Sequence, residues 1–127
     1  MKKAFTLLEM LIVIGIIAIL VTLGFASYST AQKKARDAKR QSDLKTAQQI
    51  MEQCYAVNNF QYPTIAGTGT GNITATCPAP NTDITFNLVD PLSTGTYIYT
   101  VTSATSSYSI TVDLETSTTN FTVTNQQ

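Results

Sequence analysis

An apolar segment from Phe5 to Ala26 constrains this chain more than any other feature of its sequence. Glu9 is its only charged residue, and most other positions hold Leu, Ile, Val, Met, Phe, Ala or Gly. A segment of about 20 apolar residues is long enough to cross the hydrocarbon core of a bilayer. Because backbone groups find no water to bond in lipid, a single crossing segment forms a helix. We therefore predict a membrane-spanning helix over residues 5–26.

Helical structure is predicted to continue beyond this segment. Neither Pro nor Gly occurs between Phe25 and Tyr62, and Asn58-Asn59 offers a stop signal. Two stripes recur at helical spacing: a small-residue stripe and an apolar face. The small stripe is Ala31, Ala35, Ala38 and Ser42, and the apolar face is Leu44, Ala47, Met51, Cys54 and Tyr55. The sequence thus predicts one helix over residues 5–57, with residues 27–57 as its amphipathic part.

The remaining residues, 58–127, predict a loop followed by a small antiparallel β-sheet. Residues 65–81 hold three Gly and two Pro, a composition typical of a loop. Four later runs are rich in β-branched and aromatic residues, and most of them alternate apolar with polar. These runs are residues 84–89, 97–102, 108–114 and 120–124. Short polar links favour antiparallel neighbours, with one face of the sheet packed on the helix, so the predicted class is α+β.

Charge is distributed unevenly along the chain. All eight bases lie at or before Lys45, whereas five acids and no base follow from Thr46 onward. Such asymmetry indicates that the N-terminal and C-terminal parts of the chain lie in different environments. The basic residues 33–45 are interpreted as a solvated helix face, with Asp37–Arg40 and Lys39–Asp43 at pairing distance, that contacts acids of neighbouring subunits. Contact with DNA phosphates or lipid headgroups is the alternative.

Cysteine and histidine usage limits the chemistry. Cys54 and Cys77 are the two cysteines, and the apolar N-terminus implies export, so we expect a disulfide between them; two buried thiols are the alternative. The chain has no His. It also lacks a Gly-rich phosphate loop and a recognisable pair of carboxylates, so we expect neither an enzyme nor a cofactor.

The position of Glu9 suggests a function. An ionised side chain in the middle of a membrane helix costs roughly 2.5–3.5 kcal/mol, and less near the interface, so it needs a partner. If the basic leader at residues 1–4 is removed after Ala4, the new α-amine of Phe5 is a cation at the same depth. Glu9 can then pair with this amine in its own chain or in a neighbouring subunit. Such a pair would set the register between subunits more than it would add stability.

The sequence Lys-Lys-Ala-Phe-Thr-Leu-Leu-Glu-Met at residues 2–10 resembles the class III signal of type IV prepilins and type II secretion pseudopilins. The resemblance implies a pilin fold, in which a long N-terminal α-helix packs on a small antiparallel β-sheet. It also implies that a prepilin peptidase cleaves between Ala4 and Phe5 and methylates the Phe5 amine. By the same resemblance, Glu9 is the assembly residue, together with Phe5 and Thr6.

Two departures from the family pattern concern cleavage and helix packing. Ala4 stands where Gly is usual, and the chain lacks the Pro that the family often carries near Ala26. Gly15 and Gly24 remain as positions where the helix can loosen. Together with Ala18 and Ala26, these glycines would permit close approach of neighbouring helices.

The family resemblance further implies the order of steps by which the subunit is assembled. The subunit waits in the inner membrane with its head outside, and an assembly platform with its ATPase then extracts it into an extracellular homopolymeric filament. The expected function is a structural subunit of a type IV pilus. A pseudopilin of a type II secretion or DNA-uptake system is the nearer alternative, and a monomeric membrane-anchored adhesion or binding module is the farther one. An ordinary cleaved signal peptide is a further alternative.

Some major pseudopilins bind calcium in a loop of the sheet. Asp90, Asp113 and Glu115 are the acids available for such a site here, but they lie in no calcium-loop motif. We therefore expect no metal, and we interpret these acids as solvated or turn-capping residues.

Overall fold

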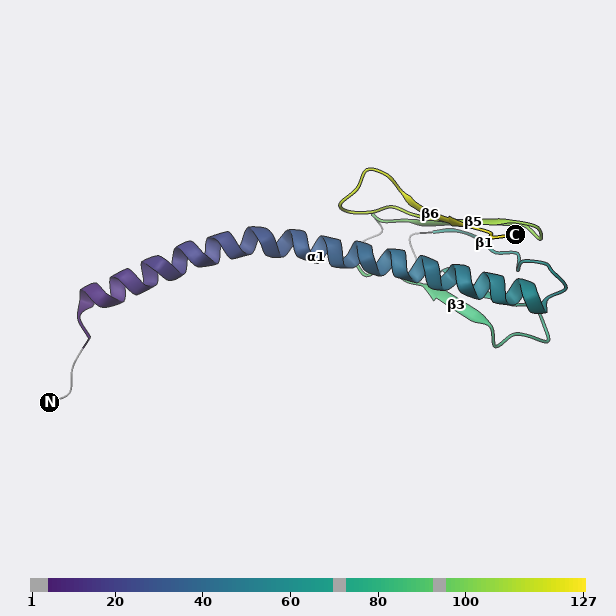
Figure 1. The fold of residues 1–127 in the computed structure, drawn as a ribbon, viewed down its shortest axis with the longest axis horizontal. Coiled ribbons are helices and arrows are strands. Elements are labelled where there is room, and N and C mark those ends of the chain that lie inside the picture. Colours follow the sequence, from purple (N-terminus) through teal and green to yellow (C-terminus); the bar gives the residue numbers. More distant parts are fainter. Residues whose placement is uncertain (1–4, 70–72, 93–95) are drawn as a thin grey trace. The chain divides into compact units, whose positions relative to one another are not determined.

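The computed structural model describes residues 5–69, 73–92 and 96–127 and contains one long helix and six strands (Figure 1). Helix α1 runs from Leu7 to Val57 over 51 residues. The chain divides into two compact units, residues 1–33 and 34–127, and α1 passes through both. We call residues 34–127 the head unit. The predicted helix end at Val57 is confirmed, whereas the start lies two residues later than Phe5.

The end of α1 is built by two residues in the left-handed region. The φ angles of Asn59 and Phe60 are 52° and 56°. The Phe60 amide donates to the Tyr55 carbonyl at 3.1 Å, and the two rings meet edge to face at 5.7 Å. A left-handed residue, a six-residue hydrogen bond and an apolar contact across the turn define a Schellman cap. The Asn58-Asn59 stop signal therefore acts through a specific backbone geometry.

All strand pairs are antiparallel and fall into two sheets. The larger sheet has the order β1-β4-β5-β6, and the smaller contains β2 and β3. The strands of the larger sheet are β1 (Ala66–Gly69), β4 (Tyr99–Ser103), β5 (Tyr108–Val112) and β6 (Phe121–Thr124). Those of the smaller sheet are β2 (Ile73–Thr76) and β3 (Thr85–Leu88).

The short polar links join antiparallel neighbours, as predicted. Val101 of β4 pairs with Ile110 of β5, which in turn pairs with Val123 of β6. These paired residues are all buried, and the residues that follow them in each strand are more exposed. The period-2 alternation therefore identified the face of the sheet that packs into the core.

Two predictions about the head are wrong. Residues 65–81 were predicted as a loop, but they contain β1 and β2. The predicted strand at residues 84–89 joins β2 in a separate sheet, so the head has two sheets and not one. In β1 the composition Ala-Gly-Thr-Gly disfavours a strand, and pairing with β4 overrides that local preference. In β2 the alternating Ile-Thr-Ala-Thr was a usable signal.

The core of the head unit joins one face of α1 to both sheets. Leu44 and Met51 of the helix have no exposed surface, and neither have Ile110 and Val112 of β5. Leu88 of β3 belongs to the same cluster. The apolar face predicted for α1 therefore packs on the sheets, as expected. Burying each of these side chains is worth about 1.5–3 kcal/mol, which makes this face the main attachment of the head to its helix.

Candidate functional site

The first turn of α1 closes through reciprocal hydrogen bonds between Thr6 and Glu9. The Thr6 amide and hydroxyl each donate to Glu9 Oε2 at 2.9 Å, and the Glu9 amide donates to Thr6 Oγ1 at 3.2 Å. This arrangement is a capping box, which satisfies amide groups that a helix start leaves unpaired. It explains why α1 begins at Leu7. The Thr-x-x-Glu spacing is visible in the sequence, but the interpretation from membrane burial paired Glu9 only with the Phe5 amine, of its own chain or of a neighbouring subunit.

The cap shows what Glu9 bonds before any cleavage of the chain. In the intact chain the Phe5 nitrogen belongs to a peptide bond, so the expected ion pair with a free Phe5 amine cannot form. Ala4 and the leader at residues 1–4 lie outside the described residues. Phe5 itself is 77% exposed, and Glu9 lies one helical turn beyond it. The intact chain therefore holds the Glu9 carboxylate on its own helix cap.

The apolar segment that follows buries none of its described residues, 5–25. Every residue from 5 to 25 is exposed, although α1 contains a stretch long and apolar enough to cross a membrane. A Cβ added at Gly15 or Gly24 would meet nothing within 4 Å. A helix surface that is apolar all round requires lipid or other helices around it. Small residues on such a surface allow helices to approach closely.

A second cluster of charged groups lies in the head unit, centred on Arg40. The Arg40 side chain is fully buried. Its Nε donates to Asp90 Oδ1 at 2.7 Å, and its Nη1 lies 2.8 Å from both Asp37 Oδ1 and Glu115 Oε1. Nη2 lies 2.7 Å from the same Asp90 oxygen but without hydrogen-bond geometry. The Tyr97 ring covers the guanidinium at 4.3 Å, a cation–π distance.

Arg36 and Asp37 extend this cluster to the segment after β5. Arg36 holds Glu115 through two hydrogen bonds of 2.7 and 2.6 Å, the two-pronged geometry that makes arginine–carboxylate pairs strong. Asp37 accepts from the amides of Glu115 and Thr116 and from the Thr116 hydroxyl. Two successive turns of α1 thus bind the segment after β3, through Asp90, and the segment after β5.

The electrostatics of the cluster favour its ionised form. Hydrogen bonds from Arg36, and then from Arg40, lower the pKa of Glu115 to about 2, although burial acts in the opposite direction. Burial alone would lower the pKa of Arg40, but its bonds to Glu115 and Asp90 raise it. Burial would raise the pKa of Asp37, but the hydrogen bonds it accepts lower it. Hydrogen bonds between opposite charges therefore stabilise the ionised forms of Asp37, Arg40 and Glu115.

These contacts bear on two interpretations of the charged residues, the solvated basic helix face and the calcium site. Arg40 was predicted on a solvated helix face and is instead buried. Its predicted pairing with Asp37 is present, and so is the exposed Lys39–Asp43 pair, at 4.0 Å. Of the three acids considered for a calcium site, Asp90, Asp113 and Glu115, two bind arginine in this structure: Asp90 and Glu115. Within the described residues, no three His, Cys, Asp or Glu side chains lie together as a metal site would require.

Glu52 anchors the other end of the sheet, and sequence reasoning did not identify it. Its carboxylate accepts from the hydroxyls of Tyr62 at 3.0 Å and Tyr108 at 2.9 Å, and from the Gln126 amide at 3.1 Å. Burial, and then the bond to Glu52, raises the pKa of both tyrosines well above the usual range. Only the fold brings these residues together, since they are far apart in the sequence.

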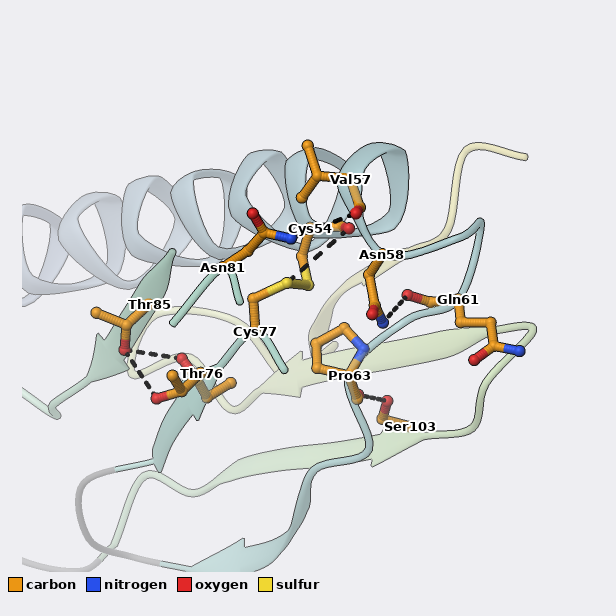
Figure 2. The surroundings of a disulfide bond; sticks show 11 residues. Cys54, Val57, Asn58, Gln61, Pro63, Thr76, Cys77, Asn81, Thr85 and Ser103 are labelled. Atoms are coloured by element: carbon orange, nitrogen blue, oxygen red, sulfur yellow. Dashed lines mark hydrogen bonds between the residues drawn. A yellow bond between two sulfur atoms is a disulfide. The ribbon is translucent and has the colours of Figure 1, made fainter. Parts of the chain in front are cut away.

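The two cysteines lie where α1 ends. Figure 2 shows Cys54, in the last turn of the helix, bonded to Cys77, which lies one residue past β2 and 23 positions later in the sequence. Their Cα atoms are 5.7 Å apart, and both side chains are almost completely buried. Asn81 adds a hydrogen bond from its side chain to the Val57 carbonyl at 3.3 Å. The segment between β2 and β3 is thereby held against the helix end.

Comparison with known proteins gives one match. Residues 1–25 match the family model described as the prokaryotic N-terminal methylation motif, which is the class III prepilin signal. No curated protein matches the chain, and no solved structure matches it. The matched residues include Thr6, Glu9 and most of the exposed apolar segment, and the head lies outside the match.

Replacing Arg40 by Ala should destabilise the head by about 3–5 kcal/mol, because the change leaves buried carboxylates without their partner. Unfolding of the detergent-solubilised chain, followed by circular dichroism in a urea series, measures the loss. Lys39→Ala is the matched control, since it removes an exposed pair worth about 0.2–1 kcal/mol. Equal effects of the two substitutions would contradict the importance of the buried cluster.

The lowered pKa of Glu115 makes the free energy of unfolding depend on pH in the acidic range. Folding lowers this pKa from 4.5 to about 2, so the contribution of Glu115 is fully present above the unfolded value and is lost as the pH falls towards 2. The stability advantage of the native chain over Glu115→Gln should therefore shrink between about pH 5 and pH 2. Urea unfolding of both proteins across this range measures it, and a constant difference would contradict the assignment.

Proposed function

We propose that this chain, which carries the class III prepilin signal of the type IV pilin and pseudopilin family, is the major structural subunit of a type IV pilus filament. The observation that carries the proposal is the methylation motif at residues 1–25, which contains an apolar helical segment whose described residues, 5–25, are all exposed. In this proposal the chain acts through assembly and not through catalysis. A pseudopilin of a secretion or DNA-uptake system shares these features and is the alternative.

Processing is the first step of the proposal. A prepilin peptidase removes residues 1–4 and methylates the new amine of Phe5. The precursor is held in the inner membrane by residues 5–26, with its head on the outer side. The capping box supports an additional role for Thr6, because it fixes the start of the helix at Leu7, two residues after the proposed new N-terminus at Phe5.

Assembly is the second step. Cleavage creates a positive charge at Phe5, one helical turn from the Glu9 carboxylate. The Glu9 carboxylate can then accept hydrogen bonds from its own capping groups or from a Phe5 amine. If that amine belongs to a neighbouring subunit, the pair would set the register between the two subunits as their helices pack together. The exposed apolar segment exchanges lipid for other copies of itself, and Gly15 and Gly24 leave room for that contact.

The mature N-terminus tests processing. Mass spectrometry of the protein from surface filaments or membranes should find Phe5 as the first residue, carrying one methyl group. Glycine is usual at the cut, so Ala4→Gly is an informative control and should be processed equally or faster. A mature N-terminus near Ser27 would instead identify an ordinary signal peptide.

Two substitutions at Glu9 separate its charge from its role in capping. Glu9→Ala removes both, whereas Glu9→Gln keeps a side chain that can complete a capping box. If the charge sets the register, both variants should insert into the membrane normally and both should reduce filaments by at least tenfold. Electron microscopy of sheared surface material measures filaments, and immunoblots of membranes measure insertion. Normal filaments from Glu9→Gln would contradict the ion-pair mechanism.

Electron microscopy also separates the two functions. A major pilin should be the main component of the sheared filaments. Its absence from them in a strain that makes filaments would favour the pseudopilin alternative.

A further inference from the structure

The charged groups of the head unit divide into those that have bonding partners among the described residues and those that have none. Arg36 and Arg40 are paired with Asp37, Asp90 and Glu115. Glu52 is occupied by two tyrosine hydroxyls and an amide. Asp43 lies 4.0 Å from Lys39. Pairing within the chain thus accounts for most of the acids and for both arginines of this unit.

The leftover bases lie on one face of the helix. Lys34 and Lys45 are exposed, and no acid among the described residues lies within ion-pair distance of either. They are eleven residues apart, which is three turns of an α-helix, so they project from the same side about 16 Å apart. We call these two residues the basic face. It lies apart from the buried face that carries Arg40, Leu44 and Met51.

Two acids are left over among the described residues. Asp113 is half-buried just after β5, and Asp83 lies at the C-terminal end of α1. Asp83 is exposed, in the segment that joins β2 to β3, and no described residue donates to its carboxylate. The bond from Asn81 to Val57 and the Cys54–Cys77 disulfide hold this segment at the end of α1 (Figure 2). The last turn of α1 contains no base, so its terminal carbonyls add partial negative charge. We call Asp83 and this helix end the acidic tip.

The basic face and the acidic tip cannot meet within one chain. Lys45 and Lys34 precede Val57 by 12 and 23 residues, which correspond to about 18 and 35 Å along the helix. A second copy displaced along the helix axis by a distance of this order brings its acidic tip beside the basic face. The contact joins two different surfaces, so each copy keeps one of each kind free for the next. Contacts of this type propagate into open helical filaments.

We propose that the basic face of one subunit binds the acidic tip of a second copy of this chain. This inference rests on the proposed function, because it supplies a head-to-head contact in the same filament. It adds a specificity element to the apolar helix bundle, which has no directional charges beyond its first turn. Because the paired charges are exposed, the contact weakens as salt concentration rises.

Charge exchange in the full-length chain tests the contact. Asp83→Lys should reduce filaments in sheared surface fractions by at least fivefold, and Lys34→Asp/Lys45→Asp should do the same, since each places like charges together. The combined triple variant should recover at least half of the native amount. The matched control is Thr118→Lys/Asn120→Lys, which adds the same charge as Asp83→Lys at two exposed positions between β5 and β6 and should assemble normally.

Zero-length carbodiimide crosslinking of membranes and filaments gives a readout that does not depend on filament yield. It should produce dimers joined between Asp83 and Lys34 or Lys45, identified by mass spectrometry. Normal filaments from Asp83→Lys, failure of the triple variant to recover, or absence of these crosslinks would overturn the proposal. Loss without recovery would point to lipid headgroups or nucleic acid on the basic face. If the crosslinks form but no pilus is made, the pilus function fails and the contact stands.

Discussion

Arg40 binds three carboxylates that reach it from three separate segments of the chain. Asp37 comes from the helix itself, Asp90 from the segment after β3, and Glu115 from the segment after β5. A buried guanidinium loses its hydration, and only a full set of partners compensates for that loss. The arrangement is therefore all-or-none, because removing one partner leaves an uncompensated charge in the interior. Such a cluster specifies where the segments meet more than it adds net stability.

This cluster marks the point along α1 where the exposed part of the helix ends and the part with a buried face begins. N-terminal to it, the described residues 5–25 are all exposed, and the sequence is apolar up to Ala26. C-terminal to it, one face of the helix is buried, from Leu44 to Cys54. The ionic cluster is the first tertiary contact of the head along α1, and the Cys54–Cys77 disulfide is among the last. Between these ends an apolar face does most of the packing.

Charge pairing also determines which charges remain for partners. The arginines and lysines of residues 33–45 form one basic stretch in the sequence. In the fold the two arginines turn inward, and the lysines stay outside. The planar guanidinium binds two carboxylates at once and is more weakly hydrated than an ammonium group, so it is the base better suited to burial. The surface offered to another molecule is accordingly smaller than the sequence suggests, and it consists of lysines.

Much of the fold followed from local signals. The helix end at Val57, the four strand-like runs and the buried face of α1 were all predictable, because each depends on periodicity or on a stop signal. The cap at Thr6 and Glu9 was also predictable, because it has the Thr-x-x-Glu spacing of a capping box. Strand β1 was not, since Ala-Gly-Thr-Gly has no preference for a strand and forms one only beside β4.

The membrane-length helix, its N-terminal signal and the general α+β class could all be predicted from the order of the residues alone. These properties reside in contiguous residues, where hydrophobicity and spacing act locally. Only the tertiary structure decided the division into two sheets, the burial of Arg40 and the anchoring of two tyrosines on Glu52. In each case the partners are separated by many residues, and a charge in a sequence does not reveal whether a carboxylate will meet it. Coulomb pairing and desolvation depend on distance in space, and the fold sets that distance.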